Sequence, residues 1–167
     1  LKFLTLLFIS CEDEVKAPVR QPVNYTILLD LSDRVLASDQ LDKDFNMIET
    51  TFKSFESHAK RNLILTSKDR FSVKIIPQKN SKFNAEKYED LLQIHLDEVN
   101  IKDKNNALIA LSKSMKNTLT ALKKEAVYSS KSTDYFGVDI WAYLHDNGKN
   151  LSKSGYKNTV IVMTDGY

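Results

Sequence analysis

The stretch Val23–Asp30, VNYTILLD, decides the fold class together with Thr159–Asp165, TVIVMTD, near the other end of the chain. Each is a short run that is almost continuously apolar and rich in β-branched and aliphatic residues. Such runs are typical of strands covered on both faces, as in a parallel sheet. Each run also ends in an aspartate, Asp30 or Asp165. We therefore expect two buried central strands whose carboxyl ends carry acidic side chains.

Helical and strand periodicities fill the sequence between these two runs. Apolar residues recur every three or four positions in two long segments, the pattern of amphipathic helices. The expected elements are helices over 41–59 and 108–126, a shorter helix over 140–148 with Trp141 in the core, a strand over 71–75, helical turns over 85–90 and an edge strand over 92–96. This alternation predicts an α/β fold of three layers, with a mostly parallel central sheet and helices on both faces.

Length and composition exclude several classes of protein. The 167 residues suffice for one domain with a substantial core, and 42% hydrophobic and 28% charged residues are ordinary for a folded chain. The net charge of +2, from 24 basic and 22 acidic side chains, gives no basic excess for binding nucleic acid. A single cysteine, Cys11, excludes both an intramolecular disulfide and a zinc site made of several cysteines.

The first residues resemble a bacterial lipoprotein leader. The apolar run Phe3–Ile9 follows Lys2 and leads into Ser10-Cys11, which is similar to a lipobox, where the cysteine thiol receives diacylglycerol. This resemblance implies a signal peptide over 1–11, a flexible tether over 12–22, a membrane anchor and a location in the cell envelope, periplasmic or at the cell surface. The alternative is that 1–11 form a buried strand with Cys11 as a core thiol.

Asp30 and Asp165 are the main candidates for a functional site. In open α/β sheets, ligands bind beyond the carboxyl ends of the strands, where the strand order reverses. If the two strands are parallel neighbours, these carboxylates converge there, and they would repel each other unless they shared a cation or a proton. A hard divalent ion resolves that repulsion, and Mg²⁺, or alternatively Mn²⁺ or Ca²⁺, is the expected cofactor.

These residues also resemble the motifs of von Willebrand factor A domains. Asp30-Leu31-Ser32-Asp33-Arg34 is similar to the D-x-S-x-S motif of that family, and Thr164-Asp165-Gly166 is similar to its later aspartate motif. The resemblance covers 23–167. It implies a metal-ion-dependent adhesion site with Asp30, Ser32 and Asp165 as ligands, whose shell a partner's carboxylate completes. A protein or glycan is the implied partner.

The chain departs from the family pattern at two positions. Arg34 replaces the third motif residue, a serine, and Val138 stands where the family has a metal-binding threonine. Thr133 or Asp139 are the candidates to replace that threonine. The remaining residues expected near the site are Asp33, Arg34 and Thr164. Two structural alternatives stay open, in which Asp30 and Ser32 cap the following helix and Asp139 is an acid at a helix N-terminus.

Three functions follow from these patterns. The first is a lipid-anchored binding module with an adhesion-type metal site, in full or degenerate form. The second is an assembly domain of the same fold without metal, which Arg34 and Val138 favour. The third is a metal-dependent phosphohydrolase that uses Asp30, although the sequence places no general base or lysine beside it. A binding protein is expected rather than an enzyme. Because an apolar strand directly precedes Tyr167, we also expect the domain to be C-terminally truncated.

Overall fold

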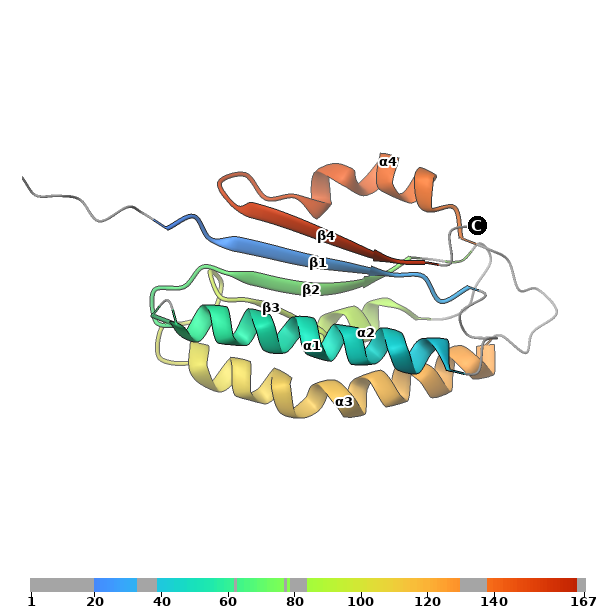
Figure 1. The fold of residues 1–167 in the computed structure, drawn as a ribbon, viewed down its shortest axis with the longest axis horizontal. Coiled ribbons are helices and arrows are strands. Elements are labelled where there is room, and N and C mark those ends of the chain that lie inside the picture. The colour runs from blue at the N-terminus through green and yellow to red at the C-terminus, as the bar shows by residue number, and fades with distance from the viewer. Residues whose placement is uncertain are drawn as a thin grey trace, which may run out of the picture.

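The computed structural model describes residues 20–32, 39–61, 63–76, 78, 84–129 and 138–164. Its elements are β1 (Val23–Leu29), α1 (Gln40–Arg61), β2 (Arg70–Ile75), α2 (Glu86–Leu91), β3 (Gln93–His95), α3 (Lys104–Ser129), α4 (Ile140–Leu151) and β4 (Lys157–Met163). The α/β class is confirmed, and each helix and strand expected from the sequence has a counterpart within a few residues. Figure 1 shows α4 above the sheet and α1 and α3 below it.

The four strands form one open mixed sheet in the order β3-β2-β1-β4. β1 is parallel to both β2 and β4, whereas β2 and β3 are antiparallel. The two apolar strands, β1 and β4, are thus parallel neighbours, which is the condition on which the site prediction depended. The expectation of a mostly parallel sheet is matched in part. β3 lies at one edge, as the alternation of its residues predicted.

The prediction that β4 is a buried central strand is wrong for the described part of the chain. β4 lies at the free edge of the sheet, and Val160 and Val162 are each 39% exposed. The apolar run resembles a central strand because its composition is the same. Its position depends instead on which strands pair with it, and among the described residues only β1 does.

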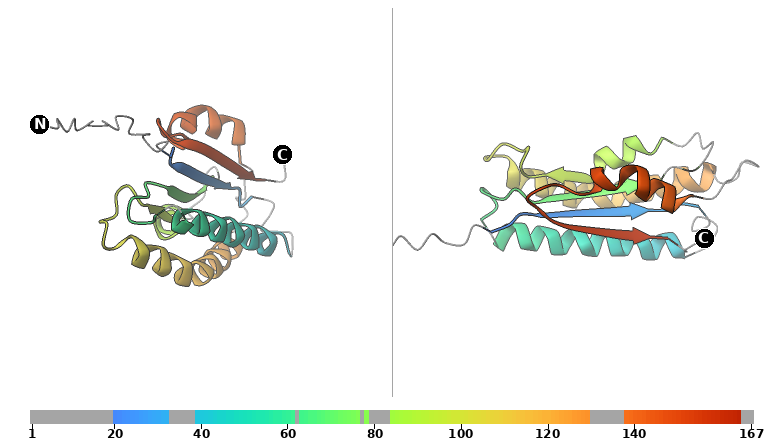
Figure 2. Two further views of the ribbon diagram at one scale, coloured as in Figure 1. Left: turned by 60° about the vertical axis from the view of Figure 1, so that its left-hand side comes forward. Right: turned by 90° about the horizontal axis from the view of Figure 1, so that it is seen from above.

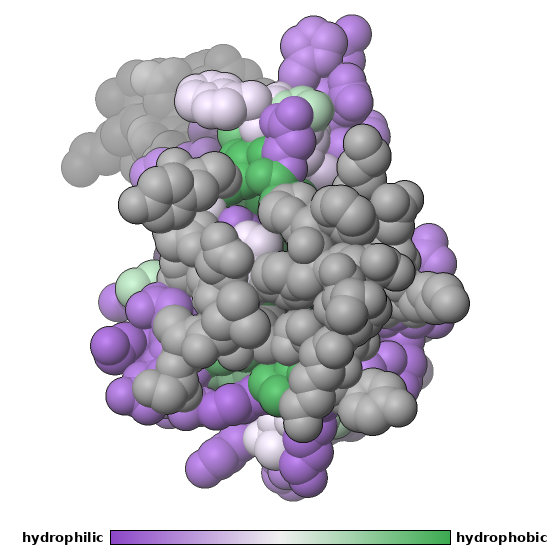
Figure 3. Space-filling view, turned by 90° about the vertical axis from the view of Figure 1, so that its right-hand side faces the viewer, coloured by the Kyte–Doolittle hydropathy of each residue, from purple (hydrophilic) through white to green (hydrophobic). Residues whose placement is uncertain are grey.

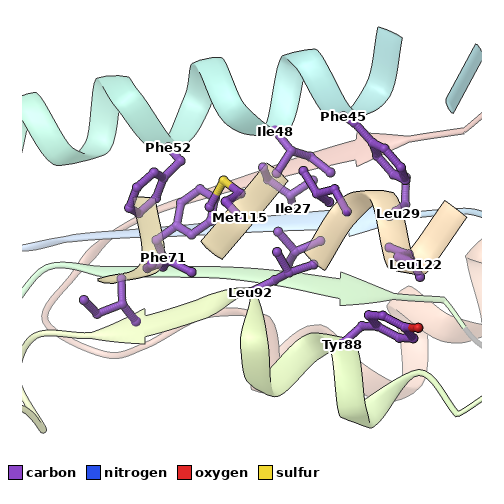
Figure 4. Packing of buried hydrophobic residues seen from close by; sticks show 14 of the residues in the cluster. Ile27, Leu29, Phe45, Ile48, Phe52, Phe71, Tyr88, Leu92, Met115 and Leu122 are labelled. Atoms are coloured by element: carbon purple, nitrogen blue, oxygen red, sulfur yellow. The ribbon is translucent and has the colours of Figure 1, made fainter. Parts of the chain in front are cut away.

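The face of the sheet below β1 and β2 in Figure 1 carries the main core. Odd-numbered residues of these strands point to this face and pack against α1 and α3, since side chains alternate along a strand. Figure 4 shows the centre of this cluster, where Phe52 of α1 meets Phe71 of β2 edge to face with ring centroids 5.2 Å apart. The labelled members are Ile27, Leu29, Phe45, Ile48, Phe52, Phe71, Tyr88, Leu92, Met115 and Leu122.

The other face carries a much smaller apolar cluster beneath α4. Its buried residues are Leu28, Ile76, Val138 and Leu151, and Ile140, Tyr143 and Leu144 pack against them. In Figure 2, right, α4 lies over the strands in the view from above. The expectation that Trp141 belongs to the core is wrong, because its side chain is 82% exposed. Positions 140, 143, 144 and 151 define the inward stripe of α4, and 141 falls outside that stripe.

A buried carboxylate fixes the amino end of the sheet. Asp69, just before β2, is 1% exposed and accepts a hydrogen bond from the backbone N–H of Val23 at 2.8 Å. It also accepts from the hydroxyl of Ser67 at 2.9 Å and from the guanidinium of Arg20 at 3.1 Å. Asp69 thereby ties the start of β1 to the start of β2.

Candidate functional site

Asp30 lies at the carboxyl end of two parallel strands. It directly follows β1, and its side chain is fully buried. Its backbone N–H donates to the carbonyl of Met163, the last residue of β4, at 3.0 Å. The pairing of β1 with β4 therefore continues up to Asp30, so the position of its carboxylate is set by the sheet. Figure 3 looks onto this end of the molecule, where the described surface is mainly hydrophilic with small hydrophobic areas.

Both carboxylate oxygens of Asp30 accept hydrogen bonds from side-chain hydroxyls. Oδ1 accepts from the backbone N–H of Ser32 at 2.8 Å and from its Oγ at 2.6 Å. Oδ2 accepts from Oγ1 of Thr164 at 3.0 Å. Three residues separated by up to 134 positions in sequence thus meet at one carboxylate. A buried carboxylate is stable only with such partners, because burial of an unpaired charge is costly.

The donor chemistry of this group fits a hard cation. It consists of one carboxylate and two hydroxyls, and oxygen ligands of this kind are the ones that Mg²⁺ and Ca²⁺ prefer. Asp30 and Ser32, both predicted as metal ligands, are brought together. Across the described part of the chain, no three His, Cys, Asp or Glu side chains gather in a way that could hold a metal. Any cation here would therefore rely on hydroxyl and water ligands beside Asp30.

Thr164 has a more direct role than the sequence indicated. It was expected only near the site, as the residue before Asp165, yet it contacts the Asp30 carboxylate itself. Because β1 and β4 are parallel neighbours in register, their first residues beyond the ladder meet side by side. The signal in the sequence was the position of a hydroxyl residue immediately after the second apolar run.

The other predicted site residues are placed differently. Asp139 is the N-cap of α4, where its side chain accepts a hydrogen bond from the backbone N–H of Ala142 at 2.8 Å. This is the helix-terminal role that the sequence left open. The predicted residues that lie outside the described ranges are Cys11, Asp33, Arg34, Thr133 and Asp165.

A second cluster of charged residues is structural in character. Asp97 accepts hydrogen bonds from Nε of Arg70 at 2.8 Å, Nζ of Lys153 at 2.7 Å and the hydroxyl of Tyr156 at 3.1 Å. Burial alone would raise the pKa of Asp97, but these three donors lower it to about 2. The carboxylate thus joins β2 to the loop between α4 and β4. Both of its oxygens accept hydrogen bonds from the protein, so Asp97 acts as a structural link.

No known family, curated protein or solved structure matches this chain. The described helices include none that is both long and apolar enough to cross a membrane. The functional argument therefore starts from the geometry at Asp30.

Proposed function

We propose that this chain forms a lipid-anchored binding module of the bacterial cell envelope, with a divalent cation held at the Asp30 carboxylate. In this proposal the domain has a three-layer fold resembling a von Willebrand factor A domain. Its partner is a protein or glycan that presents an acidic group, and Cys11 carries the lipid. The module binds and does not catalyse.

One observation carries the proposal. A fully buried aspartate stands at the carboxyl end of two parallel strands and is met by hydroxyls from two different loops. Ligand sites of α/β sheets form beyond the carboxyl ends of the strands. The sequence motif that resembles the family's metal-binding loop starts at the same residue. Fold position, donor chemistry and motif therefore agree on Asp30, and this agreement supports a cation site more than any one of them alone.

Asp30, Ser32 and Thr164 would have different roles in such a site. Asp30 would supply the negative charge, while Ser32 and Thr164 would hold its two oxygens in a fixed orientation and supply hydroxyl oxygens of their own. A bound divalent ion supplies open coordination positions that a carboxylate of the partner can fill. The buried setting strengthens the electrostatic attraction, because the surrounding dielectric is lower than that of water.

The hydrogen bonds at Asp30 also favour a second candidate, the metal-free assembly domain. Every donor around the carboxylate already comes from the protein itself. Asp30 then acts as a staple that ties the loop after β1 to the end of β4, and the surface of the domain binds a partner without metal. The two candidates differ in a property that can be measured, the response to added cation.

Calorimetric titration of the 167-residue chain with Mg²⁺ and Mn²⁺ tests the cation site. We expect saturable binding in the wild type and none in Asp30→Asn, which keeps the shape of the side chain and removes its charge. Asp69→Asn is the matched control, because Asp69 is equally buried but lies at the opposite end of the sheet. It should bind the ions as the wild type does, once circular dichroism has shown that both variants are folded.

Absence of binding in the wild type, or equal binding in Asp30→Asn, would reject the cation site. If the wild type binds no ion while Asp30→Asn loses stability, the staple function is supported instead. The anchor is tested separately by expression in a bacterial host. Cys11→Ser should move the protein from the membrane fraction to the soluble fraction, and an unchanged distribution would contradict lipidation at Cys11.

A further inference from the structure

A polar cavity of about 360 Å³ lies on the α4 side of the sheet, next to the part of that face that α4 covers. Its volume is in the range of sites for small molecules. The wall consists of residues of β1, β2 and β3, the end of α4 and the loop that follows α4. The residues that line it are Asn24, Thr26, Arg70, Ser72, Lys74, Gln93, His95, Lys149, Asn150, Leu151, Ser152 and Lys153. None of them belongs to the Asp30 site.

The register of the sheet brings polar side chains into rows across three strands. Thr26 of β1 is paired with Ser72 of β2, and Ser72 is paired with Gln93 of β3. Residues in register on adjacent strands point to the same face, about 5 Å apart. Three hydrogen-bonding side chains therefore stand side by side on the floor of the cavity, at a position where the opposite face of the same strands is apolar.

Two of these side chains are buried and have no partner. Thr26 is 4% exposed and Ser72 is 6% exposed, yet neither hydroxyl makes a hydrogen bond within the described chain. Among the described residues, every side-chain N or O atom that is inaccessible to solvent has a hydrogen-bond partner. The hydroxyl oxygens of Thr26 and Ser72 have none, so both must be accessible, and the cavity that they line is where they are exposed. Neither hydroxyl is held by a protein partner, so both are available to a ligand that enters the cavity. A ligand group with an acceptor oxygen can therefore take a hydrogen bond from each of them.

The charge of the wall indicates which ligand fits. Arg70, Lys74, Lys149 and Lys153 line the cavity, and no carboxylate does. Three of these cations form ion pairs with carboxylates that do not line the cavity. Arg70 and Lys153 pair with Asp97, and Lys74 pairs with Glu89. The fourth, Lys149, has no hydrogen bond or ion pair within the described chain.

We infer that this cavity binds the phosphate group of a small organic phosphate, by the hydroxyls of Thr26 and Ser72 and the ammonium of Lys149. A single oxyanion that accepts from two hydroxyls about 5 Å apart lies between them at ordinary hydrogen-bond lengths. Inorganic phosphate fills only part of the volume, so the natural ligand carries a further polar group of monosaccharide size that reaches Gln93 and Asn150.

The test is an NMR titration of the 167-residue chain with three probes: inorganic phosphate, glucose 6-phosphate and glucose. We expect both phosphates to shift the amide signals of Thr26, Ser72 and Gln93 in a saturable way, glucose 6-phosphate to bind more tightly, and glucose to have no effect. Added NaCl should weaken the binding, because Lys149 is exposed and its charge is screened.

The variants separate binding from folding. Thr26→Val combined with Ser72→Ala should abolish the shifts and leave the protein as stable as the wild type or more stable, since no protein partner is lost. Lys149→Gln should weaken binding roughly tenfold, the usual effect of removing one charge-assisted hydrogen bond. Lys113→Gln is the matched control, because Lys113 is an exposed lysine of α3 that does not line the cavity. It should leave the affinity for both phosphates unchanged.

Three results would overturn the inference. These are no saturable shift with either phosphate, shifts that persist in the Thr26→Val/Ser72→Ala variant, and equal binding of glucose and glucose 6-phosphate. A loss of stability in that variant would show that the hydroxyls serve the fold, and this too would count against a ligand. None of these outcomes depends on the cation site, because the probes and the variants are different.

Discussion

The two faces of the sheet are built from the same strands but carry different side chains. On the α1 and α3 side, Ile27, Leu29 and Phe71 belong to a continuous apolar core. On the α4 side, Thr26 and Ser72 alternate with them and line a polar cavity. Burial is similar on the two faces, since all five side chains are less than a tenth exposed. The difference shows that this sheet buries apolar side chains in a packed core on one face and polar side chains around a cavity on the other.

The largest effect should come from truncating the apolar face. Phe71→Ala removes a fully buried ring that contacts both Phe52 and Phe55. We expect the free energy of unfolding to fall by roughly 3–5 kcal/mol, the usual cost of such a cavity. The adjacent change Ser72→Ala points to the other face and should alter it by less than about 0.5 kcal/mol. Urea unfolding followed by circular dichroism measures both.

The contrast between the faces fails if the two substitutions have similar effects. A large loss of stability in Ser72→Ala would mean that the polar face is a second core. A small loss in Phe71→Ala would mean that α1 and α3 close over the missing ring. Comparing adjacent positions of one strand keeps strand propensity and register nearly constant.

A smaller effect should appear on the polar face when the pH is lowered. His95, which lines the cavity, has its pKa lowered from 6.5 to about 4, chiefly because it is partly buried and also because Arg70 lies beside it. Between these values the unfolded chain takes up a proton that the folded chain does not. The stabilisation is therefore complete above pH 6.5 and is lost as the pH falls towards 4.

We expect this loss to be on the order of 2–3 kcal/mol, measured as the change in unfolding free energy between pH 7 and pH 4.5. His95→Gln should remove this part of the pH dependence. His145→Gln is the control, because the side chain of His145 is 88% exposed, and it should follow the wild type. If all three proteins show the same slope, His95 is not held in its neutral form by the fold.

Much of the fold could be predicted from the sequence because its signals are local. The periodicity of apolar residues located both long helices and the strands. The position of Asp30 directly after the first apolar run identified it as a candidate site residue. Three features that depend on strand pairing could not be predicted from local signals. The edge position of β4 and the contact of Thr164 with Asp30 both follow from which strands are neighbours. The row from Thr26 to Ser72 likewise exists only in the register of β1 with β2.

The smallest effect concerns Trp141, the single tryptophan, which the sequence placed in the core and the structure places at the surface. Trp141→Ser should change the free energy of unfolding by less than about 0.5 kcal/mol, as is usual for exposed positions. Ile140→Ser, one position earlier on the inward side of α4, should cost more, because Ile140 packs against the small cluster with Leu28.

The wild-type fluorescence gives a direct readout of the same point. Since all tryptophan emission comes from Trp141, the folded protein should emit at nearly the wavelength of the urea-unfolded chain and should be quenched readily by iodide. Emission at a clearly shorter wavelength, with poor quenching, would mean that another surface covers Trp141. The outer face of α4 would then be an interface with another surface. In that case Trp141→Ser should weaken the association at this interface and leave the free energy of unfolding nearly unchanged.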